Sequence, residues 1–354
     1  MDESANPSLL KADGRTMGLR VLRLLLSSAL LAVGFFLPEG TTAQPPPHFY
    51  ALGRSTAQPR QSALYKVHTE TKHVLASLDL SQYEGPVALS SDGGQVLVMD
   101  GNKMFLFDAD RFGLRDQFAM VSKEFPWSYA GTLFAHPQSG LLYIARWGGS
   151  NPDEIAIVDP RSRKVVKVLK LKSTITGGFI YDSKRDRLYV TAASPAVLDP
   201  RTQRVLGYIK LSPRDTVFEM HLSRDGNQLF LRGEGTNLYV YDLDRAMVVR
   251  RSGPFPPSVT SIRDLALSHD GTRVFAVASA GGDRQTAVVI DSQTLTILHT
   301  LTFQEPIGGF LPAPDGRGMW VMAKNGVLRV DARTGQMLES VSLPFQLTRL
   351  ILPP

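Results

Sequence analysis

The sequence predicts an all-β fold, a seven-bladed β-propeller, and three observations support this prediction. Short apolar segments rich in Val, Ile, Leu and Tyr recur between turn residues from His48 onward. An aspartate ends such a segment every 40 to 51 residues, at Asp108, Asp159, Asp199, Asp242, Asp291 and Asp331. One apolar segment is left over at the C-terminus. A period of about 40 to 50 residues with four short strands per unit is typical of a propeller.

The repeated unit is clearest in residues 187–211, which predict three strands. An apolar, β-branched run at 188–191 is followed by a second at 195–198 and a third at 205–209. Asp199-Pro200-Arg201-Thr202 separates the last two runs, and these residue types are typical of a tight turn.

A second landmark precedes a strand in six of the units, where a hairpin turn is expected. The turn residues are Ser91-Asp92-Gly93, Gln138-Ser139-Gly140, Lys184-Arg185-Asp186, Arg224-Asp225-Gly226, His269-Asp270-Gly271 and Pro314-Asp315-Gly316. Such turns need a residue with positive φ, which Gly adopts without cost and Asp tolerates.

The first unit is incomplete, and the C-terminal segment supplies what it lacks. Strands are predicted near 49–52, 64–67 and 74–78, with no innermost strand before them. The leftover segment at 346–352 is therefore expected to complete this unit, which closes the ring and removes its exposed sheet edges. The propeller is expected to span residues 48–354.

The repeat resembles a known family. Tyr189-Val190-Thr191-Ala192, followed by Val197-Leu198-Asp199-Pro200-Arg201-Thr202, is similar to the YVTN repeat of bacterial and archaeal β-propellers, with Ala192 in place of Asn. The resemblance implies an exported or surface-exposed seven-bladed propeller, related in shape to lactonase-like propellers and to quinoprotein amine dehydrogenase heavy chains. It implies no catalytic set, because the recurring residues belong to turns and core.

The N-terminus predicts export. Arg15, Arg20 and Arg23 precede an apolar run at 24–37, and Thr41-Thr42-Ala43 offers the small residues of a cleavage site. We expect a signal peptide at 1–43, cleaved after Ala43, and a Pro-rich linker at 44–47. A retained membrane anchor is the alternative, but 14 apolar residues are too short for a bilayer core of about 30 Å. The expected location is secreted or periplasmic, with no membrane span after cleavage.

The composition of the chain excludes several kinds of site and of binding partner. The chain has no cysteine, which excludes disulfides, thiolate metal sites and a Cys nucleophile. The net charge of +6 comes from basic residues interspersed with acidic ones, so nucleic-acid binding is not expected. No metal site is expected, because the seven histidines are scattered and the Asp-x-Asp pairs fall at predicted turns. No cofactor is expected on this chain, because without cysteine any redox group would have to come from a partner.

The candidate ligand site lies where the innermost strands begin. Aligning the units on the hairpin turn places Glu219, Arg263 and Asp264 at this entrance in two adjacent blades, whereas four of the six units begin there with Gly. His221 should point to the same side of its strand as Glu219. The full candidate set is Glu219, His221, Arg263, Asp264, Arg146, Trp147, Arg232 and Lys324. The alternative is an ion-pair network around a water-filled channel, and no residue is assigned a catalytic role.

Two apolar connectors are candidate docking sites for a partner. One contains Phe125, Trp127 and Tyr129, and the other contains Phe255. The alternative, with equal weight, is that these side chains pack over the blade edges and bind no partner.

Together these features predict an exported propeller that acts as a protein-binding or scaffolding module in the bacterial periplasm or envelope, with a protein partner. The alternative is an enzyme or enzyme subunit. It would be a lactonase-like hydrolase, or the propeller subunit of a periplasmic oxidoreductase whose cofactor is on a partner chain. A surface-layer or adhesion repeat is less favoured, because one ring uses the whole chain.

Overall fold

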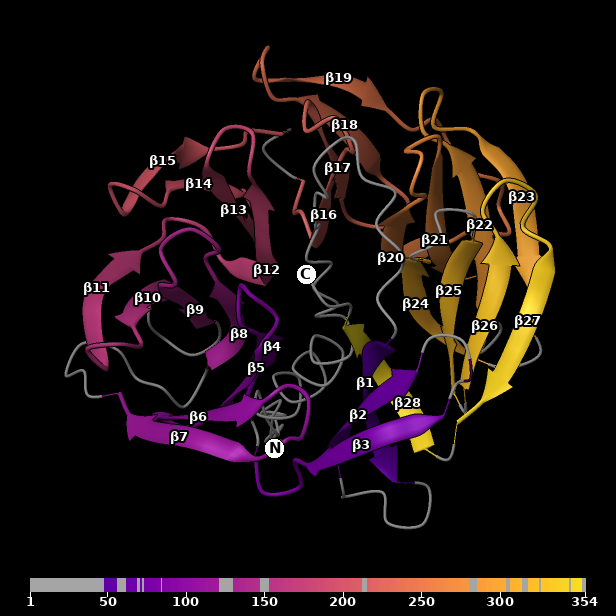
Figure 1. Ribbon diagram of the computed structural model, residues 1–354. Coiled ribbons are helices and arrows are strands. Elements are labelled where there is room, and N and C mark those ends of the chain that lie inside the picture. Colours follow the sequence, from indigo (N-terminus) through magenta and orange to yellow (C-terminus); the bar gives the residue numbers. More distant parts are fainter. Residues whose placement is uncertain are drawn as a thin grey trace, which may run out of the picture.

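The computed structural model shows seven four-stranded antiparallel sheets arranged as blades around a central axis (Figure 1), which confirms the predicted fold class. The structure describes residues 48–55, 62–68, 71, 73–83, 85–120, 130–146, 153–211, 215–279, 285–303, 306–313, 318–324, 326–343 and 345–351. The predicted signal peptide, its cleavage site and the linker lie outside this range. Among the described residues, no helix has the length and apolar character needed to cross a bilayer.

Each blade has its innermost strand next to the axis and its outermost strand at the rim. From the axis outward, blade 1 contains β28 (Phe345–Ile351), β1 (His48–Ser55), β2 (Ser62–His68) and β3 (Val74–Asp79). Blade 2 contains β4 (Val87–Leu89), β5 (Gln95–Asp100), β6 (Lys103–Asp108) and β7 (Leu114–Ala119). Blade 3 contains β8 (Ala130–Ala135), β9 (Leu142–Arg146), β10 (Glu154–Asp159) and β11 (Lys164–Lys170). Blade 4 contains β12 (Ile175–Asp182), β13 (Arg187–Ala192), β14 (Ala196–Asp199) and β15 (Arg204–Tyr208).

The remaining blades repeat the pattern. Blade 5 contains β16 (Glu219–Leu222), β17 (Gln228–Arg232), β18 (Leu238–Asp242) and β19 (Met247–Arg251). Blade 6 contains β20 (Ser261–Leu267), β21 (Arg273–Ser279), β22 (Gln285–Asp291) and β23 (Ile297–Thr302). Blade 7 contains β24 (Ile307–Pro312), β25 (Gly318–Ala323), β26 (Gly326–Asp331) and β27 (Met337–Ser342).

The C-terminal strand closes the ring as expected. β28 pairs antiparallel with β1, with Ile351 opposite Tyr50, and so forms the innermost strand of blade 1. The ring of Phe345 is fully buried and stacks on Tyr65, with ring centroids 3.7 Å apart. Because β1 bonds to β28 on one side and to β2 on the other, closure leaves β1 with no free edge.

The turns after the strand-ending aspartates and the hairpin turns both have the geometry that their residue types predict. Asp199 Oδ1 accepts hydrogen bonds from the backbone N–H groups of Arg201 and Thr202, at 2.9 and 3.3 Å. Positive φ angles occur at the described hairpin-turn glycines and, in blade 4, at Asp186 (φ 50°). The turn at 314–316 lies outside the described residues.

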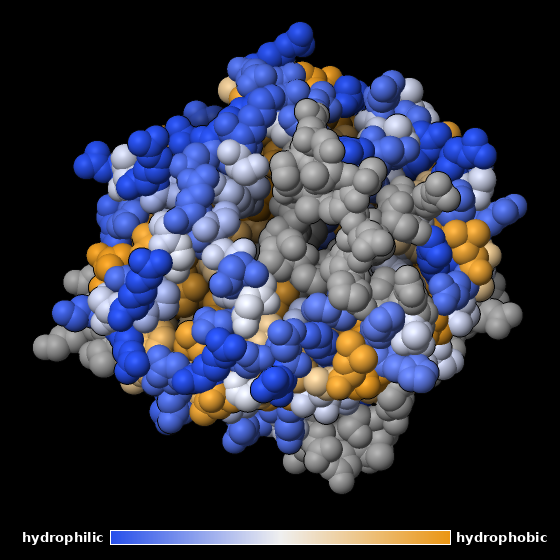
Figure 2. All heavy atoms as spheres, in the orientation of Figure 1, coloured by the Kyte–Doolittle hydropathy of each residue, from blue (hydrophilic) through white to orange (hydrophobic). Residues whose placement is uncertain are grey.

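The hydrophobic core lies between blades, because alternate residues of a strand face opposite neighbours. In β13, Leu188 and Val190 join the cluster shared with blade 3, while Tyr189 joins the cluster shared with blade 5. The large hydrophobic side chains that remain exposed lie on outermost strands. On the face seen in Figure 2, hydrophobic residues at the rim form separate spots among hydrophilic ones.

Candidate functional site

Two acidic residues lie on neighbouring inner strands: Glu219 is the first residue of β16, and Asp264 follows the β-bulge in β20. In β16, Met220 and Leu222 pack into the core shared with blade 4, so Glu219 and His221 point the other way, toward blade 6. Arg232 lies opposite Glu219 on β17 and therefore points to the same side. The strand alternation thus brings two acid–base groups and one guanidinium together.

Glu219 is only 7% exposed, and both of its carboxylate oxygens contact donors. Oε1 lies 3.1 Å from Nε2 of His221. Oε2 accepts hydrogen bonds from Nε of Arg232 at 3.2 Å and from the backbone N–H of Leu265 at 3.0 Å. The last bond crosses from blade 5 to blade 6, so the carboxylate links two blades.

Asp264 makes the corresponding link one blade further on. It is 4% exposed, and its Oδ2 accepts a hydrogen bond from the backbone N–H of Phe310, at 3.0 Å, across the boundary with blade 7. Each of the two carboxyl groups accepts a hydrogen bond from the backbone N–H of the residue 46 positions later in the chain. Glu219 and Asp264 therefore occupy equivalent positions of their blades. The next equivalent position is Gly309, where a Cβ atom would overlap with Oδ2 of Asp264.

The two carboxyl groups share a hydrogen bond, and their pKa values move in opposite directions. Burial raises the pKa of Asp264 well above its usual range, and the negative charge of Glu219 raises it further. Burial opposes ionisation of Glu219 too, but the hydrogen bond from His221 and the charges of His221 and Arg232 outweigh it and lower its pKa. Glu219 therefore holds the negative charge, and a protonated Asp264 donates to it.

The structure does not bring all of the candidates into this cluster. Arg263 is the extra residue of a β-bulge between Ile262 and Asp264, and its side chain is exposed, whereas the cluster is buried. Lys324 is also exposed, in the turn after β25. Arg146 is buried in blade 3, where it pairs with Glu154 at 2.8 Å. Trp147 lies outside the described residues.

Sequence reasoning missed Glu154. Its signal is the hairpin register, since β9 and β10 place Glu154 opposite Arg146. Long side chains of opposite charge at directly opposed positions are expected to pair.

Of the docking candidates, only Phe255 lies in the described part of the chain. It is half-buried and packs against the core cluster shared by blades 5 and 6, as the packing alternative expects. Phe125, Trp127 and Tyr129 lie outside the described residues.

In the cluster of Glu219, His221, Arg232 and Asp264, the Asp264 carboxyl keeps a proton. The hydrogen bonds of the two acidic groups connect blades 5, 6 and 7. Within the described residues, no group of three or more His, Cys, Asp or Glu is placed to hold a metal ion. A carboxylate next to a protonated carboxylic acid is also a pair that general acid–base chemistry uses, provided that a substrate reaches it.

The fold and this cluster define the chain as a seven-bladed β-propeller with a buried acidic pair on two neighbouring inner strands. No family model matches the sequence. No curated protein matches it either.

Solved propeller structures do resemble it. The periplasmic gluconolactonase of Pseudomonas aeruginosa superposes with a TM-score of 0.64 and 15% identity, covering 87% of this chain and 99% of that one. A 6-phosphogluconolactonase, described as putative, from Bacteroides fragilis gives 0.61 and 14%, covering 88% and 99%. The dihydro-heme d1 dehydrogenase NirN gives 0.62 and 14%, covering 89% and 77%. At these identities the likeness concerns the fold alone.

Proposed function

We propose that this chain is an exported propeller of the YVTN-repeat type that acts as a protein-binding module in the bacterial envelope. One observation carries the proposal: the acidic groups on the two inner strands already bind protein donors. Glu219 accepts bonds from Arg232 and Leu265, and Asp264 accepts one from Phe310. Groups committed in this way join blades 5, 6 and 7 and support a rigid scaffold.

Export is part of the same proposal. It rests on the basic flank, the apolar run at 24–37 and the small residues that end at Ala43. N-terminal sequencing of the protein recovered from the periplasm is expected to begin at Gln44. A protein retained in the cytoplasm with its N-terminus uncleaved would contradict export.

The test of binding is affinity purification from the native envelope. The full chain, expressed with its own N-terminal segment and a tag after Pro354, is expected to recover one protein in stoichiometric amount. The matched control is an unrelated exported propeller carrying the same tag. Recovery of the same background from both baits would overturn the binding proposal.

A lactonase-like hydrolase is the second candidate, and a specific observation favours it. Glu219 is ionised while its neighbour Asp264 keeps a proton, and two of the structural neighbours are described as lactonases. Hydrolysis of gluconolactone by the purified chain, measured against Glu219→Gln, tests it. A loss of at least about 100-fold in the variant would support a general base, and a rate equal to the buffer blank would reject the enzyme.

A further inference from the structure

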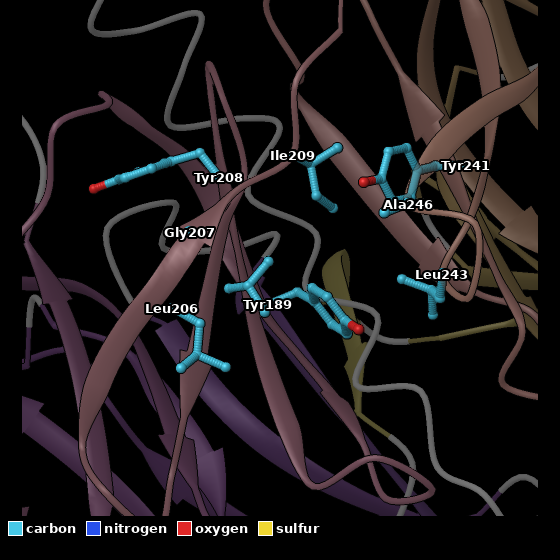
Figure 3. Close-up of a pocket in the computed structure, with 9 residues that line it drawn as sticks. Tyr189, Leu206, Gly207, Tyr208, Ile209, Tyr241, Leu243 and Ala246 are labelled. Atoms are coloured by element: carbon cyan, nitrogen blue, oxygen red, sulfur yellow. The ribbon is translucent and has the colours of Figure 1, made fainter.

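A groove on the outer part of the ring lies between blades 4 and 5 (Figure 3). We call it the blade 4–5 groove, and Tyr189, Val197, Leu206, Gly207, Tyr241 and Leu243 are its main lining residues. Its volume is about 240 Å³. Pockets for whole organic ligands usually measure about 300 to 1,000 Å³, so this groove fits a smaller group, such as one side chain.

The groove exists because blade 4 has a glycine where other blades have a side chain. Tyr189, Val197 and Gly207 lie directly opposite one another on β13, β14 and β15, so all three face blade 5. Each blade has a β-bulge at this place, which fixes the position equivalent to Gly207. The other blades carry Ala76, Asp116, Lys167, Arg250, His299 and Glu339 there.

Two tyrosine hydroxyls lie between the strands that line the groove. Tyr189 is 3% exposed and Tyr241 is 8% exposed, and Figure 3 shows their hydroxyl groups directed into the space between blades 4 and 5. Neither hydroxyl has a hydrogen-bond partner within the described residues. Burial raises the pKa of both side chains, so both hydroxyls remain donors at neutral pH. Neither hydroxyl oxygen is among the buried polar atoms that lack a partner, so both are open to solvent at the groove, and a ligand acceptor would replace water there.

The surroundings of the groove are apolar and cationic. Leu206 forms part of its wall and is 53% exposed. Arg204 precedes this wall by two residues, and Arg245 is next to Ala246 at the other side; both are exposed, and neither forms an ion pair in the described part of the chain. The nearby Asp244 is already paired with Arg185 at 2.5 Å. Asp242, between Tyr241 and Leu243, forms no ion pair in the described part of the chain, but its Oδ1 accepts hydrogen bonds from the backbone N–H groups of Asp244 and Arg245. The exposed charges beside the groove that lack both an ion pair and a backbone partner are therefore the two arginines.

We propose that the blade 4–5 groove binds an extended acidic segment of a partner protein. One apolar side chain of that segment occupies the hollow over Gly207, and a backbone carbonyl accepts from Tyr189 or Tyr241. Acidic residues on either side of the apolar one face Arg204 and Arg245. The proposal rests on the proposed binding function and adds to it where the partner docks and what chemistry it presents.

The test is a selection from a displayed library of random linear peptides against the full chain, with Gly207→Val as the counter-target. A Cβ at Gly207 meets no atom within 4 Å, and its φ is not positive, so valine fills the groove without strain. Selected peptides are expected to carry an apolar residue flanked by Asp or Glu, and to bind Gly207→Val at least about 10-fold more weakly. Tyr241→Phe is expected to weaken binding about 3- to 10-fold through the lost hydroxyl.

The matched control is Gly113→Val, another Gly-to-Val change with open space around its Cβ, in blade 2. It is expected to bind the selected peptides as wild type does. Selected peptides that are basic or proline-rich would overturn the inference. Peptides that bind Gly207→Val and Gly113→Val equally well would overturn it too. So would self-association of the wild type that Gly207→Val abolishes, because the occupant would then be a second copy.

Failure of this inference is distinguishable from failure of the proposed function. If the envelope purification recovers a partner equally well with wild type and Gly207→Val, the partner docks elsewhere and only the groove is wrong. If the wild type recovers no partner at all, the binding function itself fails.

Discussion

Asp264 fits between blades 6 and 7 only because the next blade offers a glycine. A Cβ at Gly309 would overlap with Oδ2 of Asp264, whereas a Cβ at the adjacent Gly308 would lie 3.7 Å from Cβ of Met322. We expect Gly309→Ala to lower the free energy of unfolding by about 1–3 kcal/mol, since the carboxyl must move in a close-packed site. Gly308→Ala is the matched control and should change it by less than about 1 kcal/mol. Denaturant unfolding of the two variants checks this, and equal effects would contradict the proposed role of Asp264.

The proton on Asp264 makes stability depend on pH in a defined direction. Its pKa is raised above the usual 3.8, so its contribution is complete at low pH and is lost as pH rises through the folded-state pKa. The pKa of Glu219 is lowered below 4.5, so its contribution is present above that value and is lost as pH falls through the folded-state pKa. The Asp264 contribution begins to fall above pH 3.8 and the Glu219 contribution is complete only at pH 4.5, so the pair stabilises the protein most near these two values.

Replacing Asp264 by Asn tests this directly. The amide accepts from Phe310 N–H and donates to Glu219, as the protonated acid does, but it cannot ionise. We expect Asp264→Asn to unfold at nearly the wild-type free energy in mild acid and to be the more stable of the two in alkali. Asp264→Ala leaves the Phe310 N–H without its acceptor and removes the donor that Asp264 offers to Glu219, and it should cost about 2–3 kcal/mol in mild acid. Denaturant titrations from about pH 5 to pH 9 measure the curves, and parallel curves for wild type and Asn would refute the assignment.

At the residue scale, all four members of the cluster are among the candidates drawn from the sequence, together with residues that the structure places elsewhere. Glu219 and Asp264 follow from aligning the units on the hairpin turn, because the strand length between turn and entrance is nearly constant. The same alignment assigns Arg263 to this site, yet Arg263 is the extra residue of a β-bulge and has no paired position on β21. Such a bulge has no reliable sequence signal, so the side to which Arg263 points could not be predicted.

At the scale of single strands, β28 is the element on which blade 1 depends most. Its first residue, Phe345, is fully buried and belongs to the core cluster between blades 7 and 1. We expect Phe345→Ala to cost about 3–5 kcal/mol, because it removes a stacked ring and leaves a cavity. Leu338→Ala on β27, where the leucine is 50% exposed, is the surface control and should stay within about 0.5 kcal/mol. Thermal unfolding followed by circular dichroism compares them, and similar melting temperatures would mean that β28 contributes little to closure.

The order of the strands is predictable from the sequence because the period and the turn residues repeat. The blade 4–5 groove is not predictable in this way. The sequence places Gly207 in a strand, but a glycine in a strand can mark a bulge, a bend or a close approach of another group. Only the register shows that its equivalents in the other blades carry side chains. Likewise, the repeat identifies Tyr189 as a strand residue, but the direction of its hydroxyl depends on the neighbouring blade.

At the scale of the whole molecule, the ring depends on contact between residues from its two ends. Blades 2 to 7 each form from consecutive strands, whereas blade 1 requires residues 48–79 and 345–351 together. Such a long closure is entropically costly, so we expect it to form after the blades built from consecutive strands. The closing strand therefore controls whether the protein folds as one unit.

A circular permutant separates the strand itself from its place in the sequence. Since β28 runs antiparallel to β1, with Ile351 opposite Tyr50, a short linker joins the two as a hairpin in a chain that starts at Phe345 and ends at Leu343. We expect this permutant to unfold cooperatively within a few degrees of wild type, and a truncation that ends at Leu343 to aggregate through the exposed edge of β1. Thermal unfolding and size-exclusion chromatography compare the three chains. If the truncated chain stays monomeric and equally stable, the seventh innermost strand is dispensable. If the permutant aggregates as well, the sheet order of blade 1 is wrong.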